Sequence, residues 1–135
     1  MGCTNWTEIN IQNITSKTLS FRKAQHEWGK FDSSEKEIEI YPQDLDKKKI
    51  APNKEYKIGA CGRENTWSGC DGNFELRDDA ANVVVAKIKF YSPHSLFYNQ
   101  FSIDCPTQDW TASQTGAYLS NDQALEAIAV AVSNV

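Results

Sequence analysis

The stretch that decides the fold runs from Ala60 to Leu76 and reads ACGRENTWSGCDGNFEL. Alternating apolar residues lead into it from Tyr56, and further apolar residues leave it at Phe74 and Leu76. Three glycines and a run of polar residues lie between them, which is the composition of a loop. The stretch therefore predicts two strands joined by a long glycine-rich connection.

Trp67 stands near the middle of this loop, between Thr66 and Ser68. A large aromatic side chain in such a place either fills the protein core or contacts a molecule outside the protein. The small polar neighbours favour exposure, whereas Trp110, on an alternating segment, is expected in the core. Tryptophan and tyrosine also prefer the membrane interface, where the ring lies among head groups and its polar edge stays hydrated.

Most of the chain alternates between apolar and polar residues in short segments that are typical of strands. Such segments are expected at 7–14, 18–28, 37–41, 56–61, 72–77, 83–91, 97–105, 110–112 and 117–119. In the third of these, Ile38 and Ile40 are expected to point inward, and residues 31–36 read as a polar loop. The tail from 124 to 132 fits a helix by its alanines or a buried strand by its alternation. The pattern predicts an all-β fold, a single-domain β-sandwich of two antiparallel sheets over residues 1–135.

Composition and charge limit the classes of partner. Apolar residues make up 40% of the 135 residues and charged residues 24%, which is ordinary for a soluble globular protein. The net charge of −4 argues against nucleic acid, because phosphate binding needs clustered Lys and Arg. It also argues against attraction to anionic lipid. A membrane contact would rely on aromatic burial and on a zwitterionic head group.

The chain carries no recognisable targeting segment. Residues Met1 to Asn5 lack a basic start and an apolar run, so no signal peptide is expected. No stretch approaches the roughly 20 apolar residues that span a bilayer as a helix. We therefore expect synthesis in the cytosol, with any release by an unconventional route and action at target-cell membranes.

Neither a metal site nor a cofactor is expected. The four cysteines form no C-x-x-C pair and the chain has only two histidines, so the spacing argues against zinc. Cys61 and Cys70 could be bridged across their loop in an oxidising compartment. In the cytosol all four cysteines are expected to be reduced, acting as small apolar groups.

The sequence contains no established catalytic motif. We find no G-x-S-x-G elbow, no H-E-x-x-H and no phosphate-binding loop. His26, followed by Glu27, could act as a base only beside a nucleophile, and a hydrogen bond at a strand edge is the commoner role for such a residue. We expect no enzymatic activity.

The central stretch also resembles a known signature. A-C-G-R at 60–63, followed after five residues by G-x-x-G-x-F-E-L at 69–76, is similar to the signature of the aegerolysins. Trp6, the Trp28-Gly29-Lys30 segment and the turn at 51–55 agree with the family in order and spacing, so the resemblance covers nearly the whole chain. It implies a β-sandwich of the aegerolysin and actinoporin type, and a strand for the tail.

The resemblance implies lipid binding without catalysis. Aegerolysins bind sphingolipid-containing membranes, with or without sterol, and several recruit a perforin-like partner protein that forms a pore. Some of these pairs kill insects. The resemblance thus implies the recognition component of a two-component cytolysin.

The resemblance also implies lipid-contacting residues. Trp6 and Trp28 coincide with family tryptophans tied to lipid contact, and Phe97 or Tyr98 belongs to the same face. Fungal lipid sensors carry a glutamate where this chain has Ser68, so their lipid specificity does not transfer. Our hypothesis is that Trp67 inserts while Ser68 donates a neutral hydrogen bond to the head group.

Three other functions stay open on the sequence. A lectin-like sandwich that binds glycans would also display Trp and Tyr beside Asn and Asp. A small hydrolase would use His26. The aromatic loops would otherwise bind another protein, including a second copy of this chain in a homo-oligomer.

Overall fold

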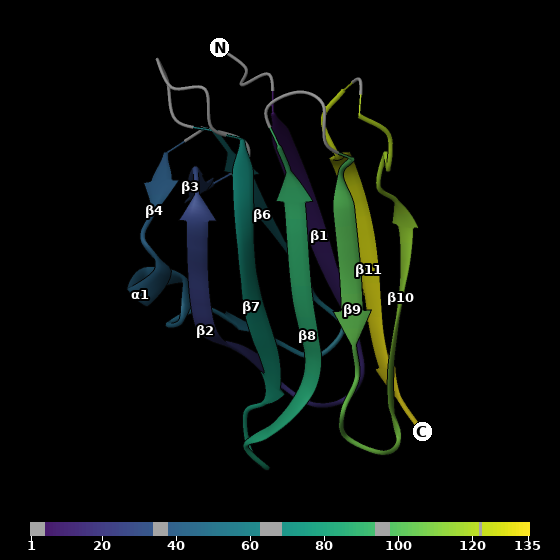
Figure 1. Cartoon of the computed structure of the whole chain (residues 1–135). Coiled ribbons are helices and arrows are strands. Elements are labelled where there is room, and N and C mark those ends of the chain that lie inside the picture. Colours follow the sequence, from purple (N-terminus) through teal and green to yellow (C-terminus); the bar gives the residue numbers. More distant parts are fainter. Residues whose placement is uncertain (1–4, 34–37, 63–68, 94–97, 122) are drawn as a thin grey trace.

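A computed structural model describes residues 5–33, 38–62, 69–93, 98–121 and 123–135 (Figure 1). These residues form two β-sheets packed face to face, as the sequence predicts. One sheet has six strands in the order β10-β11-β1-β6-β3-β4, and the other has five in the order β5-β2-β7-β8-β9. In Figure 1 strands β2, β7 and β8 lie in the nearer layer.

The element bounds follow the predicted alternation closely in the longer strands. The elements are β1 (Trp6–Ile14), β2 (Leu19–Trp28), β3 (Lys30–Asp32), β4 (Glu39–Ile40), α1 (Pro42–Leu45), β5 (Lys49–Ile50), β6 (Glu55–Cys61), β7 (Cys70–Asp78), β8 (Val83–Ser92), β9 (Gln100–Asp104), β10 (Trp110–Gly116) and β11 (Glu126–Asn134). Within the described residues, no helix is long and apolar enough to cross a membrane.

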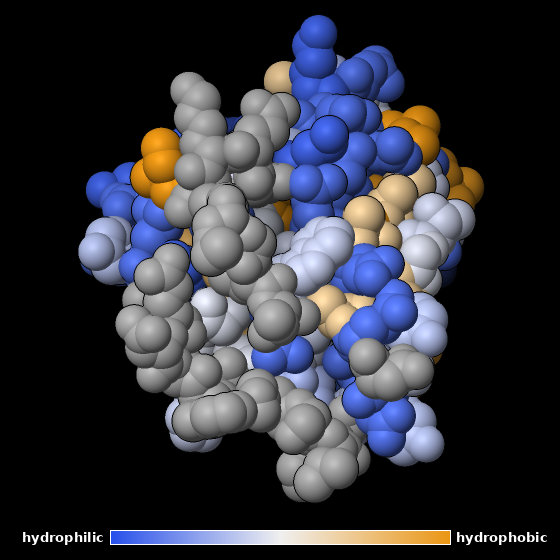
Figure 2. Space-filling view, turned by 90° about the horizontal axis from the view of Figure 1, so that it is seen from above, coloured by the Kyte–Doolittle hydropathy of each residue, from blue (hydrophilic) through white to orange (hydrophobic). Residues whose placement is uncertain are grey.

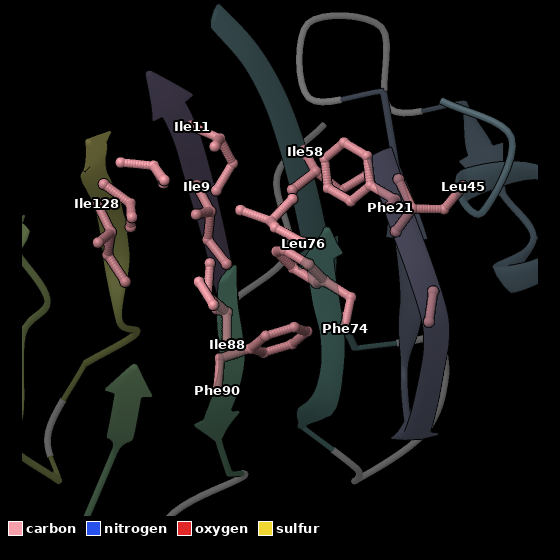
Figure 3. Close-up of a cluster of buried hydrophobic side chains, with 14 of the residues drawn as sticks. Ile9, Ile11, Phe21, Leu45, Ile58, Phe74, Leu76, Ile88, Phe90 and Ile128 are labelled. Carbon is pink, nitrogen blue, oxygen red and sulfur yellow. The ribbon is translucent and has the colours of Figure 1, made fainter. Parts of the chain in front are cut away.

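The core is formed by the apolar side chains that alternate inward from both sheets (Figure 3). Phe21 of β2 and Phe74 of β7 pack with ring centroids 5.2 Å apart, and Phe31 lies edge-on to Phe90 at 5.9 Å. All four rings are at most 1% exposed. Trp110 is also buried, as predicted. Since the two sheets share this core, their ends are held in a fixed relation to each other.

The tail forms a strand, and its pairing departs from the predicted antiparallel pattern. β11 runs parallel to β1, with Thr7 opposite Glu126 and Ile14 opposite Ser133, while every other paired strand is antiparallel in the described residues. Alternation of apolar and polar residues predicts which face of a strand is buried. It does not predict whether the neighbouring strand runs parallel or antiparallel.

Several local predictions are wrong. Phe31 belongs to strand β3 and is fully buried rather than part of a polar loop. Ile38 is 60% exposed instead of pointing inward, because it lies outside the two-residue strand β4, which is itself an outer strand of its sheet. The strand predicted over 97–105 is shorter: β9 begins only at Gln100, so residues 98 and 99 lie before it. Residues 117–119 do not form the predicted strand, because β10 ends at Gly116.

The cysteines differ from the expectation of four reduced thiols. Cys61 is disulfide-bonded, whereas Cys70 and Cys105 are free. The bridge between Cys61 and Cys70 is therefore not formed. Cys70 is 1% exposed and packs in the core as a small apolar group, as expected.

Candidate functional site

Strand pairing brings the predicted aromatic residues to one end of the sandwich. Trp6, at the start of β1, lies opposite Cys61 at the end of β6. Trp28, at the end of β2, lies opposite Asp71 near the start of β7. Tyr98 follows β8, whose last residues pair with the same start of β7. We call this end, the upper one in Figure 1, the aromatic end.

The aromatic residues at this end differ in exposure. Trp28 is 55% exposed and Tyr98 63%, whereas Trp6 is half-buried. The other predicted site residues, Trp67, Ser68 and Phe97, lie outside the described residues. Figure 2 looks onto this end and shows mostly hydrophilic side chains among the described residues, with hydrophobic ones in separate groups. This surface suits aromatic rings that lie among head groups better than it suits deep apolar insertion.

Two further exposed residues at this end were not predicted. Tyr118 and Leu119, 39% and 54% exposed, lie in the connection between β10 and β11. That connection belongs to the aromatic end because β11 begins beside the start of β1. The sequence after Gly116 predicts a strand, and that prediction did not indicate that these two side chains are exposed. Only the structure places them at the surface of this end.

A buried asparagine joins the two exposed loops. The side-chain amide of Asn99 donates hydrogen bonds to the carbonyl oxygens of Tyr118 and Gln123, both at 2.7 Å. The backbone N–H of Asn99 also donates to the carbonyl oxygen of Ser120 at 3.0 Å. Asn99 is only 5% exposed, so these bonds are shielded from water. They hold the segment that carries Tyr98 against the connection that carries Tyr118 and Leu119.

Gly29 lets the chain pass from one sheet to the other at this end. Its φ of +77° lies in the left-handed region, which favours glycine. A Cβ there would lie 2.4 Å from the carbonyl oxygen of Cys61 and 3.0 Å from the Cβ of Cys70. The close approach packs the end of β2 against both strands that border the glycine-rich loop, and it fixes the position of Trp28.

A carboxylate lies between two of the aromatic residues. Asp71 is opposite Trp28 on one side and Tyr91 on the other, so the three side chains share one face of the five-stranded sheet. Partial burial raises the pKa of Asp71 above 3.8, Lys89 opposes the rise, and Glu27 adds to it. A carboxylate flanked by aromatic rings can attract the cationic part of a ligand.

The neighbouring thiol does not share this chemistry. Burial, together with the negative charges of Asp71 and Asp32, raises the pKa of Cys70 to about 12. The thiol therefore stays protonated and unreactive at neutral pH.

His26 is placed for packing. Its ring lies edge-on to the buried Phe31, with centroids 5.7 Å apart, and it is half-buried on β2 opposite Gly72. Among the described residues, no group of three or more His, Cys, Asp or Glu side chains could hold a metal ion.

Similarity to known proteins establishes the family of this chain. A family model described as aegerolysin matches residues 4–135. The chain belongs to the aegerolysin family. Aegerolysin Aa-Pri1 of Cyclocybe aegerita is 28% identical over 118 residues, covering 86% of this chain and 81% of that protein. Asp-hemolysin of Aspergillus fumigatus is 29% identical over 100 residues, covering 73% and 70%.

A solved structure supports the fold of this aegerolysin. The crystal structure of the RahU protein superposes with a TM-score of 0.90 at 21% identity, covering 99% of this chain and 98% of that one. At this identity the likeness concerns the fold alone. Membership of the family makes this chain one of a group of lipid-binding proteins.

Proposed function

We propose that this aegerolysin binds membranes through its aromatic end and acts as the lipid-recognition component of a two-component pore-forming cytolysin. The observation that carries the proposal is the gathering of Trp28, Tyr98, Tyr118 and Leu119 at one end, each more than a third exposed. Side chains of these types bury their apolar parts at the membrane interface while their polar edges stay hydrated. Trp6 borders the same surface and contributes its exposed part.

The electrostatics favour a zwitterionic head group, and we propose a sphingolipid of that kind. With a net charge of −4 the protein gains nothing from anionic lipid. Asp71 between Trp28 and Tyr91 supplies a negative charge and two aromatic faces to a head-group cation. Such a contact is worth about 0.5–2 kcal/mol per ring. In this proposal Trp67, Ser68, and Phe97 together with Tyr98 complete the lipid contact.

The partner is a larger perforin-like protein that inserts once the aegerolysin has marked the membrane. This part of the proposal rests on the family resemblance, since several aegerolysins act in this way and some of the pairs are insecticidal. The aegerolysin itself would carry out no chemical reaction, and it would act on the outer surface of a target cell.

Vesicle flotation tests the lipid proposal. Wild-type protein is mixed with phosphatidylcholine vesicles that contain no addition, phosphatidylserine, sphingomyelin, ceramide phosphoethanolamine, or either sphingolipid with sterol. We expect co-flotation with at least one sphingolipid mixture and none with plain or phosphatidylserine-containing vesicles. Equal flotation with all vesicles, or with none, would contradict sphingolipid recognition.

Dye release tests the two-component part separately. Responsive vesicles loaded with a self-quenched dye are treated with the aegerolysin, with a purified perforin-like protein of the kind that acts with other aegerolysins, and with both. We expect release only with both proteins. Release by the aegerolysin alone would show that it needs no partner.

A further inference from the structure

The outer face of the five-stranded sheet carries a groove that the aromatic end does not use. Its volume is about 610 Å³, and its polar lining residues are Lys23, Gln25, Asn73, Glu75, Lys87, Lys89, Ser102 and Asp104. Volumes of this size hold small organic ligands, which bind through a few well-placed polar groups. The groove lies on the strands that face the reader in Figure 1.

Strand register arranges the lining in rows across the sheet. Asn73 of β7 lies opposite Lys89 of β8, which lies opposite Ser102 of β9. Gln25 extends this row, and its side-chain amide donates to the Asn73 side-chain oxygen at 3.1 Å. Lys87 lies in the next row, between Glu75 of β7 and Asp104 of β9. The rows therefore present hydrogen-bond donors and acceptors side by side.

The charges of the groove favour an acidic ligand. Lys23, Lys87 and Lys89 line it, and in the described part of the chain none of them forms an ion pair within 4.0 Å. The carboxylate of Glu75, which also lines the groove, already pairs with Arg77 at 3.0 Å. Asp104 is the other carboxylate of the lining, so three ammonium groups stand against one carboxylate that forms no ion pair among the described residues. This excess of positive charge in a concave site attracts anions, even though this protein is acidic overall.

A β-bulge places one of these lysines. The pairing of β2 with β7 shifts register between Arg22 and Gln25, and Lys23 has a φ of +54°. The bulge is held in place because the Asp46 carboxylate accepts a hydrogen bond from the N–H of Ala24 at 2.9 Å. A left-handed lysine is costly, and bulges commonly redirect a side chain toward a binding site.

The groove begins next to the aromatic end. The row that contains Asp71 and Tyr91 lies two residues further along β7 and β8 than the row of Asn73 and Lys89. Two residues of a strand span about 7 Å, which is close to the length of one sugar ring. A head group held at the aromatic end could therefore extend into the groove as a short chain of sugars.

We infer that this groove binds an acidic saccharide. The Lys87 and Lys89 ammonium groups contact its acid group, and the hydroxyl groups pair with Gln25, Asn73 and Ser102, because a hydroxyl both donates and accepts. The saccharide is either free or the head group of a glycolipid. In the second case the inference extends the proposed membrane binding, but the groove itself can be tested without any membrane.

Titration of ¹⁵N-labelled protein with free sialyllactose provides this test, with lactose as the uncharged control. We expect amide shifts at Asn73, Lys89 and Ser102 with sialyllactose and clearly weaker ones with lactose. Lys87→Gln combined with Lys89→Gln should lower the affinity about tenfold or more, since two charge-assisted hydrogen bonds are lost. Lys57→Gln, an exposed lysine on the other sheet, should leave the affinity unchanged.

Vesicles distinguish the two sources of the saccharide. Phosphatidylcholine vesicles with and without a ganglioside that carries the same sialyllactose are compared by flotation of wild type and of the double lysine variant. Shifts with free sugar, or ganglioside-dependent flotation lost in the double variant, support the groove. Absence of both, or equal response to lactose, overturns the inference. Failure of all lipid binding with intact sugar shifts would contradict only the proposed function.

Discussion

At each end of the sandwich a buried asparagine joins neighbouring loops through its side-chain amide. At the lower end, opposite the aromatic end, Asn13 donates to the carbonyl oxygens of Lys17, Ile50 and Ala51 at 2.7–3.1 Å. At the aromatic end Asn99 donates to two carbonyl oxygens at 2.7 Å. The two asparagines have the same structural role. The ends differ in the chemistry of the side chains that surround each asparagine.

At the lower end, two neighbouring carboxylates are paired within the chain. Asp79 pairs with Lys49 at 3.1 Å and with Arg22 at 3.8 Å, and Asp78 accepts hydrogen bonds from the two backbone N–H groups that follow in its turn. The aromatic end instead exposes Trp28 and Tyr98, and it holds a carboxylate with a raised pKa between aromatic rings. The difference in side-chain chemistry is the basis for proposing that the aromatic end, and not the lower end, contacts the membrane.

The largest expected effect is that of Gly29→Ala. The left-handed φ and the 2.4 Å approach of the added Cβ to the Cys61 carbonyl oxygen should lower the free energy of unfolding by about 2–4 kcal/mol. Urea denaturation measures it. Ala81→Ser, in the exposed turn of the lower end, is the control and should change stability by less than about 0.5 kcal/mol. Equal midpoints for both variants would show that the crossing at Gly29 tolerates a side chain.

The two asparagines provide a matched pair. Asn99→Ala and Asn13→Ala should each lower the free energy of unfolding by about 1–3 kcal/mol, because buried carbonyl groups lose their donor. Only Asn99→Ala should also weaken flotation with responsive vesicles, since it removes the side-chain hydrogen bonds that join the segment of Tyr98 to the connection of Tyr118 and Leu119. Both variants are assayed at a temperature where they remain folded. Weaker flotation with Asn13→Ala as well would mean that stability, and not the aromatic end, governs binding.

The two ends should respond to pH in opposite directions, with a smaller effect. Burial raises the pKa of Asp71, so the folded state holds this proton more tightly, and stability falls as the pH rises through the range above 3.8. The hydrogen bond from Lys49 lowers the pKa of Asp79, so its stabilisation is present above 3.8 and is lost as the pH falls through the lowered value.

Substitution of each carboxylate checks these signs. At neutral pH, Asp71→Asn should be at least as stable as wild type, and Asp79→Asn should be less stable. Both differences should shrink in acid, where the carboxylates are protonated. Urea denaturation at neutral and acidic pH measures them. A loss of stability in Asp71→Asn at neutral pH would contradict the desolvation argument.

The strands with strict alternation could be predicted from the sequence. In β7 every second residue from Cys70 to Asp78 is buried, so the pattern reveals both the strand and its inward face. Ile38 shows where this reasoning fails. Its alternation with Ile40 is real, but burial depends on whether another element covers the strand, which a local pattern does not contain. The parallel pairing of β1 and β11 is tertiary information of the same kind.

The site was predictable in part. The family resemblance led to Trp6, Trp28 and Tyr98, and strand pairing places them at one end. Tyr118 and Leu119 could not be found in this way. Their place depends on the Asn99 amide, which reaches carbonyl groups 19 and 24 residues away. The outer groove was also hidden, because it needs the register of four strands and a bulge at Lys23.

Flotation of Trp28→Ala and Ile14→Ala with a responsive sphingolipid vesicle tests the central claim most directly. The two side chains are almost equally exposed, 55% and 56%, and they lie at opposite ends. Trp28→Ala should lower the membrane affinity, measured by flotation over a range of lipid concentrations, about tenfold, the effect of losing roughly 1.4 kcal/mol of aromatic burial. Ile14→Ala should bind as wild type does. Equal binding by the two variants would contradict the assignment of membrane binding to the aromatic end.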